Sequence, residues 1–183
     1  MGGAAKALLD LGGERIVERQ LAVLRPLFEE VIVVGNDPAP FAYLGVPVVP
    51  DAIPGKGAPG GVYTALAHAA TPWVFCLACD MPFPSALAIG LLAARREGAR
   101  AVAPVWKGYP EPLFAFYATA NRLPFEQALR AGDPSLMQFL RLAEALLVPE
   151  AELEAVDPGV RSLWNVNTPE DLARVLGEGP HRG

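Results

Sequence analysis

Short apolar runs alternate along this chain with stretches of helical periodicity, and this alternation restricts the fold more than any other feature. Residues 31–35, VIVVG, are rich in β-branched residues and are followed by Asn and Asp, which is typical of a buried strand that leads into a loop. Residues 73–79 form a second, longer apolar run. Because helical patterns separate such runs, we expect a mostly parallel sheet that is covered on both faces.

The remaining segments complete this pattern. Residues 14–28 place apolar side chains at helical spacing between Glu and Arg residues, which predicts an amphipathic helix. The strands expected at 101–106 and 112–117 are joined by a link short enough for an antiparallel hairpin, so the sheet is expected to be mixed. A weaker strand pattern lies at 45–51, and further helices are expected at 62–70, 84–96, 121–131 and 134–146. Asp133 is expected to cap the helix at 134–146. A last helix is expected to begin with Thr168 as its cap, and Asp171 completes a capping box there.

Length and composition favour one domain over residues 1–183, with 52% hydrophobic residues to build a core. The formal charge of −5 is spread without a basic run, which argues against nucleic-acid and anionic-membrane partners. No apolar stretch reaches the roughly 20 residues of a membrane span, and the N-terminus lacks a signal-peptide pattern. We therefore expect a cytoplasmic protein.

Cys76 and Cys79 form a C-x-x-C pair that is compatible with a redox or zinc site. In a strand, however, these two positions point to opposite faces of the sheet. The chain also has only two histidines to complete a metal site. We interpret both cysteines as small core residues.

The apolar run at 73–79 ends on a lone carboxylate, Asp80. An ionised Asp beside a hydrophobic strand is costly unless a helix cap, a hydrogen-bond network or a metal compensates it. The helix expected near Pro84 begins too far along the chain for Asp80 to cap it well. Since Mg²⁺ typically uses one or two carboxylates together with water and substrate phosphates, we expect Asp80 to be a Mg²⁺ ligand.

Lysines are rare in this chain, with three lysines against twelve arginines. Two of them, Lys6 and Lys56, lie in glycine-rich stretches. Glycines let backbone N–H groups approach a phosphate, and lysine supplies a compact charge to neutralise it. Either lysine alone is compatible with a solvated loop residue, but their joint placement favours a phosphate site.

In an open α/β sheet, ligands bind outside the carboxyl ends of the strands. Loops expected at such ends carry polar side chains suited to binding, although each of these residues is also common in ordinary loops. They are Asn36, Asp51, Asp80, and Asn165 with Asn167.

Four motifs carry a resemblance to a known family: MGGAAKALLDLGG, VVPDAIPGKGAPGG, CDMPF and NVNTPEDL. Together, and in this order, they resemble the bacterial molybdenum cofactor guanylyltransferases, also called molybdopterin-guanine dinucleotide synthases. The similarity extends over nearly the whole chain. CDMP alone would indicate only the wider nucleotidyltransferase-like family.

The resemblance implies a Rossmann-like three-layer α/β/α sandwich, of the nucleotide-diphospho-sugar transferase type. It also implies transfer of GMP from GTP to the terminal phosphate of molybdopterin, with Mg²⁺ as cofactor and pyrophosphate as the leaving group. By match to the family pattern, Lys6 contacts nucleotide phosphate, Asn36 and Asp51 lie in the nucleotide site, and Asp80 binds Mg²⁺. Asn165 and Asn167 match residues on the pterin side of the cleft.

The chain departs from the family pattern at its start. The family begins with an apolar strand and the signature L-A-G-G-x-S-x-R-M-G, whereas here Met1, Gly2 and Gly3 match only the end of that signature. We expect that Met1 is an internal methionine taken for a start, that the sheet has a gap where the strand belongs, and that residues 1–183 alone are poorly active. Ala5 also stands where the family commonly has Asp.

Three alternatives stay open at this point. On the same scaffold, the chain could transfer a cytidylyl group to molybdopterin, or a guanylyl group to phospholactate. It could also be a non-catalytic protein that binds nucleotide and delivers cofactor to molybdoenzymes or to other cofactor-biosynthesis proteins.

Overall fold

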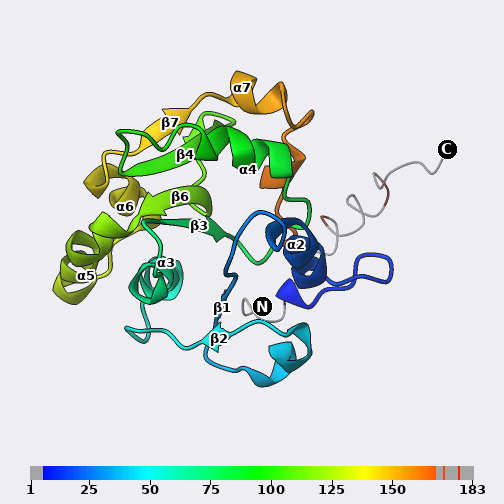
Figure 1. The fold of residues 1–183 in the computed structure, drawn as a ribbon, viewed down its shortest axis with the longest axis horizontal. Helices are drawn as coiled ribbons and strands as arrows, with labels where there is room; N and C mark the ends of the chain where they lie inside the picture. The colour runs from blue at the N-terminus through cyan, green and yellow to red at the C-terminus, as the bar shows by residue number, and fades with distance from the viewer. Residues whose placement is uncertain (1–5, 168–170, 172–176, 178–183) are drawn as a thin grey trace.

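A computed structural model describes residues 6–167, 171 and 177 of the chain. Its main sheet lies between two helical layers, with α3 (Gly57–His68), α5 (Arg122–Ala131) and α6 (Leu136–Leu142) on one face (Figure 1). The other face is covered by α4 (Ala86–Ala93) and α7 (Glu150–Glu154). The expected three-layer α/β/α sandwich is confirmed.

The main sheet has five strands in the order β3–β6–β4–β5, with β7 paired to β4. Their bounds are β3 (Trp73–Leu77), β4 (Ala101–Trp106), β5 (Tyr109–Pro110), β6 (Phe114–Ala118) and β7 (Leu146–Val148). Strands β3 and β4 both run antiparallel to β6, and β7 runs parallel to β4. Thus β3, β4 and β7 point the same way, and β6 and β5 oppose them. The sheet is mixed, as expected, but it has fewer parallel pairings than expected, because β6 lies between β3 and β4 and opposes both.

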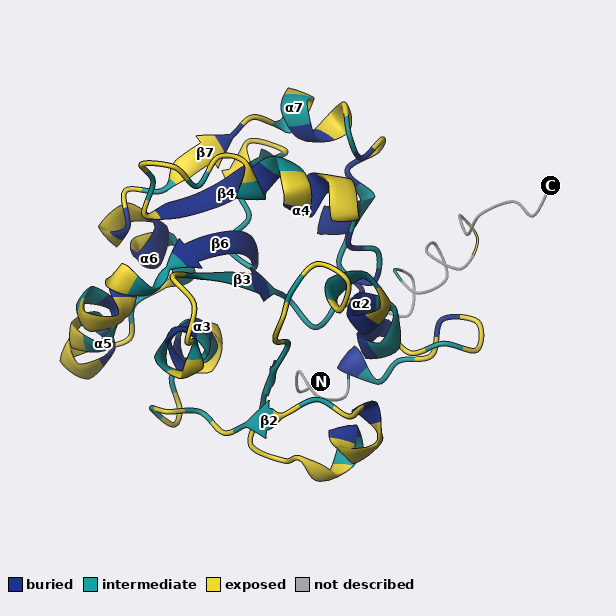
Figure 2. Cartoon of the chain, viewed as in Figure 1, coloured by how far each residue is buried: buried dark blue, intermediate teal, exposed yellow. Residues whose placement is uncertain are grey.

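Side chains alternate across this sheet and build two separate parts of the core. Tyr117 points to the α3–α5–α6 face, where it meets Phe125 at a ring-centroid distance of 5.9 Å. On the α4–α7 face, Phe75 packs against Phe114 and Phe116. Buried residues follow the sheet and the inner sides of these helices (Figure 2). Because successive side chains of a strand point to opposite faces of the sheet, the position of a residue along its strand determines which half of the core it enters.

A second, smaller sheet lies beside the main one. It consists of β1 (Val33–Val34) and β2 (Val48–Val49), which pair in parallel and are hydrogen-bonded to no other strand of the described residues. The 3₁₀ helix η1 (Ala39–Leu44) connects them, and α2 (Ile16–Leu24) packs on them through Val17 and Leu21. Strands β1 and β3 are not paired with each other, so the described residues form two separate sheets.

Several elements differ from the sequence-based expectations. Helix α3 begins at Gly57, inside the stretch expected to be a loop. Since proline is tolerated in the first turn of a helix, Pro59 does not prevent the helix from beginning there. Ser135, not Asp133, caps α6, and its Oγ accepts from the Gln138 backbone N–H. The helix expected to reach residue 146 ends at Leu142, and residues 146–148 form strand β7, which pairs with β4. The cap expected at Thr168 lies outside the described residues.

Neither cysteine forms a disulfide in the described residues, and Cys79 is only partly buried. Cys76 is buried, and burial raises the pKa of its thiol to about 12. A thiol that stays protonated at neutral pH is a poor redox nucleophile or metal ligand. In the part of the chain that the structure describes, no helix combines the length and apolar character needed to cross a bilayer.

Replacing Phe139 by Ala tests the larger half of the core. Phe139 is fully buried in α6 and stacks on Phe125 with ring centroids 3.8 Å apart. We expect the free energy of unfolding to fall by about 3–5 kcal/mol in urea titrations. As a matched control, Leu123→Ala removes a side chain of α5 that is 61% exposed and should change stability by no more than about 0.5 kcal/mol. Equal losses in the two variants would contradict this packing.

Candidate functional site

Three residues from distant parts of the sequence meet just beyond the carboxyl end of β3. Lys6 Nζ donates to Asp80 Oδ2 at 3.2 Å and to Asn167 Oδ1 at 2.5 Å. The side chains of Lys6 and Asp80 are 20% and 17% exposed, so the ion pair is largely shielded from solvent. The structure thus brings together Lys6, Asp80 and Asn167, all of which were expected at the site from the sequence.

Asp80 is held in place by hydrogen bonds to the backbone around it. The Val166 backbone N–H donates to the Asp80 carbonyl oxygen at 2.9 Å, which ties the loop after β3 to the C-terminal segment. Gln20 of α2, only 7% exposed, donates through Nε2 to the carbonyl oxygens of Ala78 (2.7 Å) and Met81 (2.9 Å). Because one buried amide bonds the chain on both sides of Asp80, the carboxylate sits on a fixed turn.

A second carboxylate, Glu111, lies near this cluster, ahead of β6. Its Oε1 accepts from the Leu113 backbone N–H at 3.0 Å. Burial raises the pKa of Glu111, the Leu113 bond opposes that rise, and the charge of Asp80 adds to it. The two carboxylates therefore repel each other, and a bound cation would reduce this repulsion.

Asn36 and Asp51 lie at the carboxyl ends of β1 and β2 and bind each other. Asn36 Nδ2 donates to Asp51 Oδ2 at 2.8 Å, and the Asp51 backbone N–H donates to Asn36 Oδ1 at 2.9 Å. Buried Thr64 of α3 fixes the following loop, because its Oγ1 accepts from the Ala52 N–H and donates to the Gly60 carbonyl. The structure thus pairs these two expected residues on the smaller sheet.

Lys56 is not part of the Lys6 cluster. Its Nζ donates to Asp133 Oδ1 at 2.7 Å and to the Gly132 carbonyl at 2.8 Å. The Asp133 side chain is 86% exposed, so solvent screens this ion pair. Lys6 and Lys56, which both lie in glycine-rich stretches of the sequence, therefore bind different partners.

Asn165 carries a buried polar atom without a partner among the described residues. Its Oδ1 accepts no hydrogen bond from any of them. An unsatisfied buried acceptor is uncommon in native proteins and costs about 1–3 kcal/mol. It is therefore available to a donor group on a ligand, two residues from the Asn167 amide that binds Lys6.

No group of three or more His, Cys, Asp or Glu side chains arranged to hold a metal occurs among residues 6–167, 171 and 177. A closed protein cage such as a structural zinc site is thus not formed by these residues. Mg²⁺ needs only one or two carboxylates when substrate phosphates supply further oxygens. Asp80, with Glu111 near it, fits that requirement.

Sequence reasoning missed three residues that shape the site: Gln20, Thr64 and Glu111. Gln20 lies on a helix whose pattern predicts only amphipathicity, and nothing local indicates that its amide reaches a turn some 60 residues away. Thr64 likewise resembles any small helical residue. Glu111 stands in KGYPE, where a short connection between strands was the only local signal.

Comparison with known proteins agrees with this geometry. Residues 1–150 match the family model described as a MobA-like NTP transferase domain. A probable molybdenum cofactor guanylyltransferase of Pelotomaculum thermopropionicum is 36% identical over 99% of this chain and 89% of its own length. Another from Chloroflexus aggregans is 36% identical over 94% of this chain and 86% of its own length.

A solved structure shares the fold as well. The crystal structure of molybdopterin-guanine dinucleotide biosynthesis protein A from Archaeoglobus fulgidus superposes with a TM-score of 0.80 at 27% identity, covering 94% of this chain and 89% of its own. The matched family model spans most of the chain, and the first relative is similar over nearly all of it. This chain therefore belongs to the family of MobA-like nucleotidyltransferases.

Proposed function

We propose that this protein transfers GMP from GTP to molybdopterin and releases pyrophosphate. The single observation that carries the proposal is the Lys6–Asp80–Asn167 cluster at the carboxyl end of β3, in a chain that belongs to a nucleotidyltransferase family. The relatives named molybdenum cofactor guanylyltransferase support guanine as the base and molybdopterin as the acceptor.

In the proposed reaction, an oxygen of the terminal phosphate of molybdopterin attacks the α-phosphorus of GTP in line. The bond from that phosphorus to the oxygen bridging to the β-phosphate breaks, and pyrophosphate leaves with the bond's electron pair. No side-chain nucleophile is required, so the protein contributes alignment and charge neutralisation. In this proposal Lys6 neutralises phosphate charge, and Asn36 and Asp51 hold the nucleoside part.

The proposal assigns Mg²⁺ to Asp80, with Glu111 as a further carboxylate near it. When bound, the ion would neutralise charge on the phosphates and on the leaving pyrophosphate. Asn165 Oδ1, which accepts no hydrogen bond from the residues that the structure describes, is suited to accept from an N–H group on the pterin side. Lys56 exchanges its ion pair with Asp133, which solvent screens, for a contact to a phosphate of the nucleotide.

Replacing Asp80 by Asn keeps the side-chain shape but removes the charge. We expect guanylyl transfer to fall by two orders of magnitude or more, on the order of the loss for a single electrostatic contact to a transition state. Mn²⁺ binding, measured by electron paramagnetic resonance as a probe for Mg²⁺, should weaken in parallel. Glu97→Gln, at an exposed position, is the control. Unchanged metal binding in the Asp80 variant would refute the metal assignment.

Replacing Gln20 by Leu tests the turn that holds Asp80. The change removes both hydrogen bonds from Nε2 while keeping apolar bulk in α2. We expect kcat to fall by about tenfold while KM for GTP changes little, because positioning of the carboxylate matters most in the transition state. A Gln20→Glu variant, whose ionised carboxylate can donate to neither carbonyl oxygen, should not restore the rate. A loss confined to thermal stability would mean that Gln20 is only structural.

Competition between nucleotides tests the base. With Mg²⁺ present, unlabelled GTP should displace a fluorescent GTP analogue at a concentration at least about tenfold lower than CTP, which corresponds to a difference of about 1.4 kcal/mol in binding free energy. Displacement by CTP at the lower concentration would favour cytidylyl transfer instead. Phospholactate offered in place of molybdopterin should yield no pyrophosphate.

A further inference from the structure

Lys56 is fixed along its backbone and at the start of its side chain. It directly precedes α3, and its carbonyl oxygen accepts from the Gly60 backbone N–H at 3.2 Å. A Cβ atom added at Gly60 would lie only 2.8 Å from Lys56 Cβ, so the first turn of the helix packs directly against the lysine. The far end of the side chain, which carries the ammonium group, is therefore the part of Lys56 that can move.

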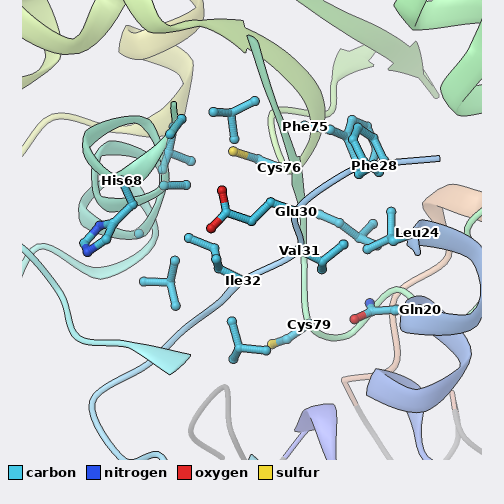
Figure 3. Close-up of a pocket in the computed structure, with 18 of the residues that line it drawn as sticks. Gln20, Leu24, Phe28, Glu30, Val31, Ile32, His68, Phe75, Cys76 and Cys79 are labelled. Carbon is cyan, nitrogen blue, oxygen red and sulfur yellow. The ribbon is translucent and has the colours of Figure 1, made fainter. Parts of the chain in front are cut away.

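Helix α3 itself is held by the core. Val62 and Leu66 are buried in the same cluster as Cys76 of β3. Figure 3 shows Cys76 directed toward this helix, which ends at His68. A change of partner by Lys56 thus requires rotation of its side chain and leaves the closely packed helix where it is.

A series of hydrogen bonds connects Lys56 to the loop that leaves the carboxyl end of β2. Ala52 follows Asp51, and its backbone N–H donates to Thr64 Oγ1 at 2.9 Å. Thr64 Oγ1 donates in turn to the carbonyl oxygen of Gly60 at 2.8 Å, and Gly60 binds Lys56 through its N–H. The lysine backbone therefore keeps a fixed position relative to Asp51, a residue of the proposed nucleotide site.

The ammonium group of Lys56 is bound by the α5–α6 loop, residues 132–135. Helices α3 and α5 are neighbours in the layer on this face of the main sheet (Figure 1). Lys56 Nζ donates to the Gly132 carbonyl at 2.8 Å and to Asp133 Oδ1 at 2.7 Å, which occupies two of its three N–H donors. The loop thus holds the charge of Lys56 through one carboxylate and one carbonyl oxygen.

The two members of this ion pair differ in their exposure to solvent. The Lys56 side chain is 22% exposed, whereas the Asp133 side chain is 86% exposed. Water stabilises so exposed a carboxylate almost as well as the lysine does, which makes the pair weak. A weak pair can be exchanged for another anion, whereas a buried pair would retain the lysine.

A phosphate group is a stronger partner for this ammonium than Asp133. It carries more negative charge than a carboxylate and offers more acceptor oxygens, and lysine is a common phosphate ligand. The Lys56 ammonium points toward the α5–α6 loop in this structure, so Asp133 and a phosphate at the nucleotide site would compete for it. The free energy that binds Lys56 to Asp133 is then subtracted from the affinity for phosphate.

We propose that Asp133 is a positioning residue that acts through Lys56. It holds the ammonium group when no phosphate is bound, competes with bound pyrophosphate for it, and so promotes release of that product. The inference rests on the proposed function for the identity of the product. The competition itself requires only that a phosphate group binds at Lys56.

Binding of inorganic pyrophosphate with Mg²⁺ to the full chain, measured by titration calorimetry, tests this competition without turnover. Asp133→Asn should tighten binding by about two- to fivefold, the factor that an exposed ion pair contributes. Glu97→Gln removes the same charge at an exposed position and should leave the affinity unchanged. If Asp133 acts through Lys56, adding Asp133→Asn to a Lys56→Gln variant should have no further effect.

Product inhibition provides a second readout that a purely structural role would not change in this direction. In guanylyl transfer assays, pyrophosphate should inhibit the Asp133→Asn variant at a concentration about two- to fivefold lower than the unaltered chain. Thermal unfolding should be nearly the same for both proteins, since the pair is exposed. If the chain transfers no GMP, the proposed function fails, whereas the calorimetric comparison still decides the role of Asp133.

Three calorimetric results would overturn the inference. Weaker binding or unchanged binding in the Asp133 variant would mean that this carboxylate does not compete with phosphate. Tighter binding that persists in the Lys56→Gln background would reflect the net charge of the chain instead of release of Lys56. Absence of pyrophosphate binding by the unaltered chain would remove the competitor that the inference requires.

Discussion

The arrangement of the site depends on one compensated charge. Asp80 lies three residues beyond the apolar strand β3, where an isolated, largely shielded carboxylate would cost several kcal/mol in desolvation. Lys6 offsets that cost through an ion pair that is largely shielded from solvent, and Asn167 shares the same ammonium group. Removing either charge would leave the other largely shielded from solvent without its ionic partner. The N-terminal segment, the end of β3 and the C-terminal segment are therefore connected at one point.

The rest of the structure keeps that point in place. The main sheet is held between two layers of apolar side chains, and Phe75 and Phe116 fix the strands that lead to the site. Gln20 then bonds the turn around Asp80 from α2. A rigid core carries the strand, and a few buried hydrogen bonds orient the residue at its end, which suits a reaction that depends on alignment.

The polar residues of the site are divided between two sheets. Asn36 and Asp51 lie on the β1–β2 sheet, whereas Asp80 follows β3 in the main sheet. No backbone pairing connects these two sheets in the described residues. The relative position of the two groups thus rests on side-chain packing of α2 and α3, which is less directional than a ladder of strand hydrogen bonds.

The sequence by itself determined the class of fold, because periods of two and of three to four residues are local properties that any segment displays. It also marked Asp80 and Lys6, since a charge beside an apolar run and a lysine among glycines are local anomalies. Only the tertiary structure decided that Lys6 binds Asp80 while Lys56 binds Asp133. It also decided that residues 146–148 pair with β4. The same holds for the residues that shape the site from a distance, which are Gln20, Thr64 and Glu111. These contacts join residues distant in sequence, and such pairs become neighbours only when the whole core has closed.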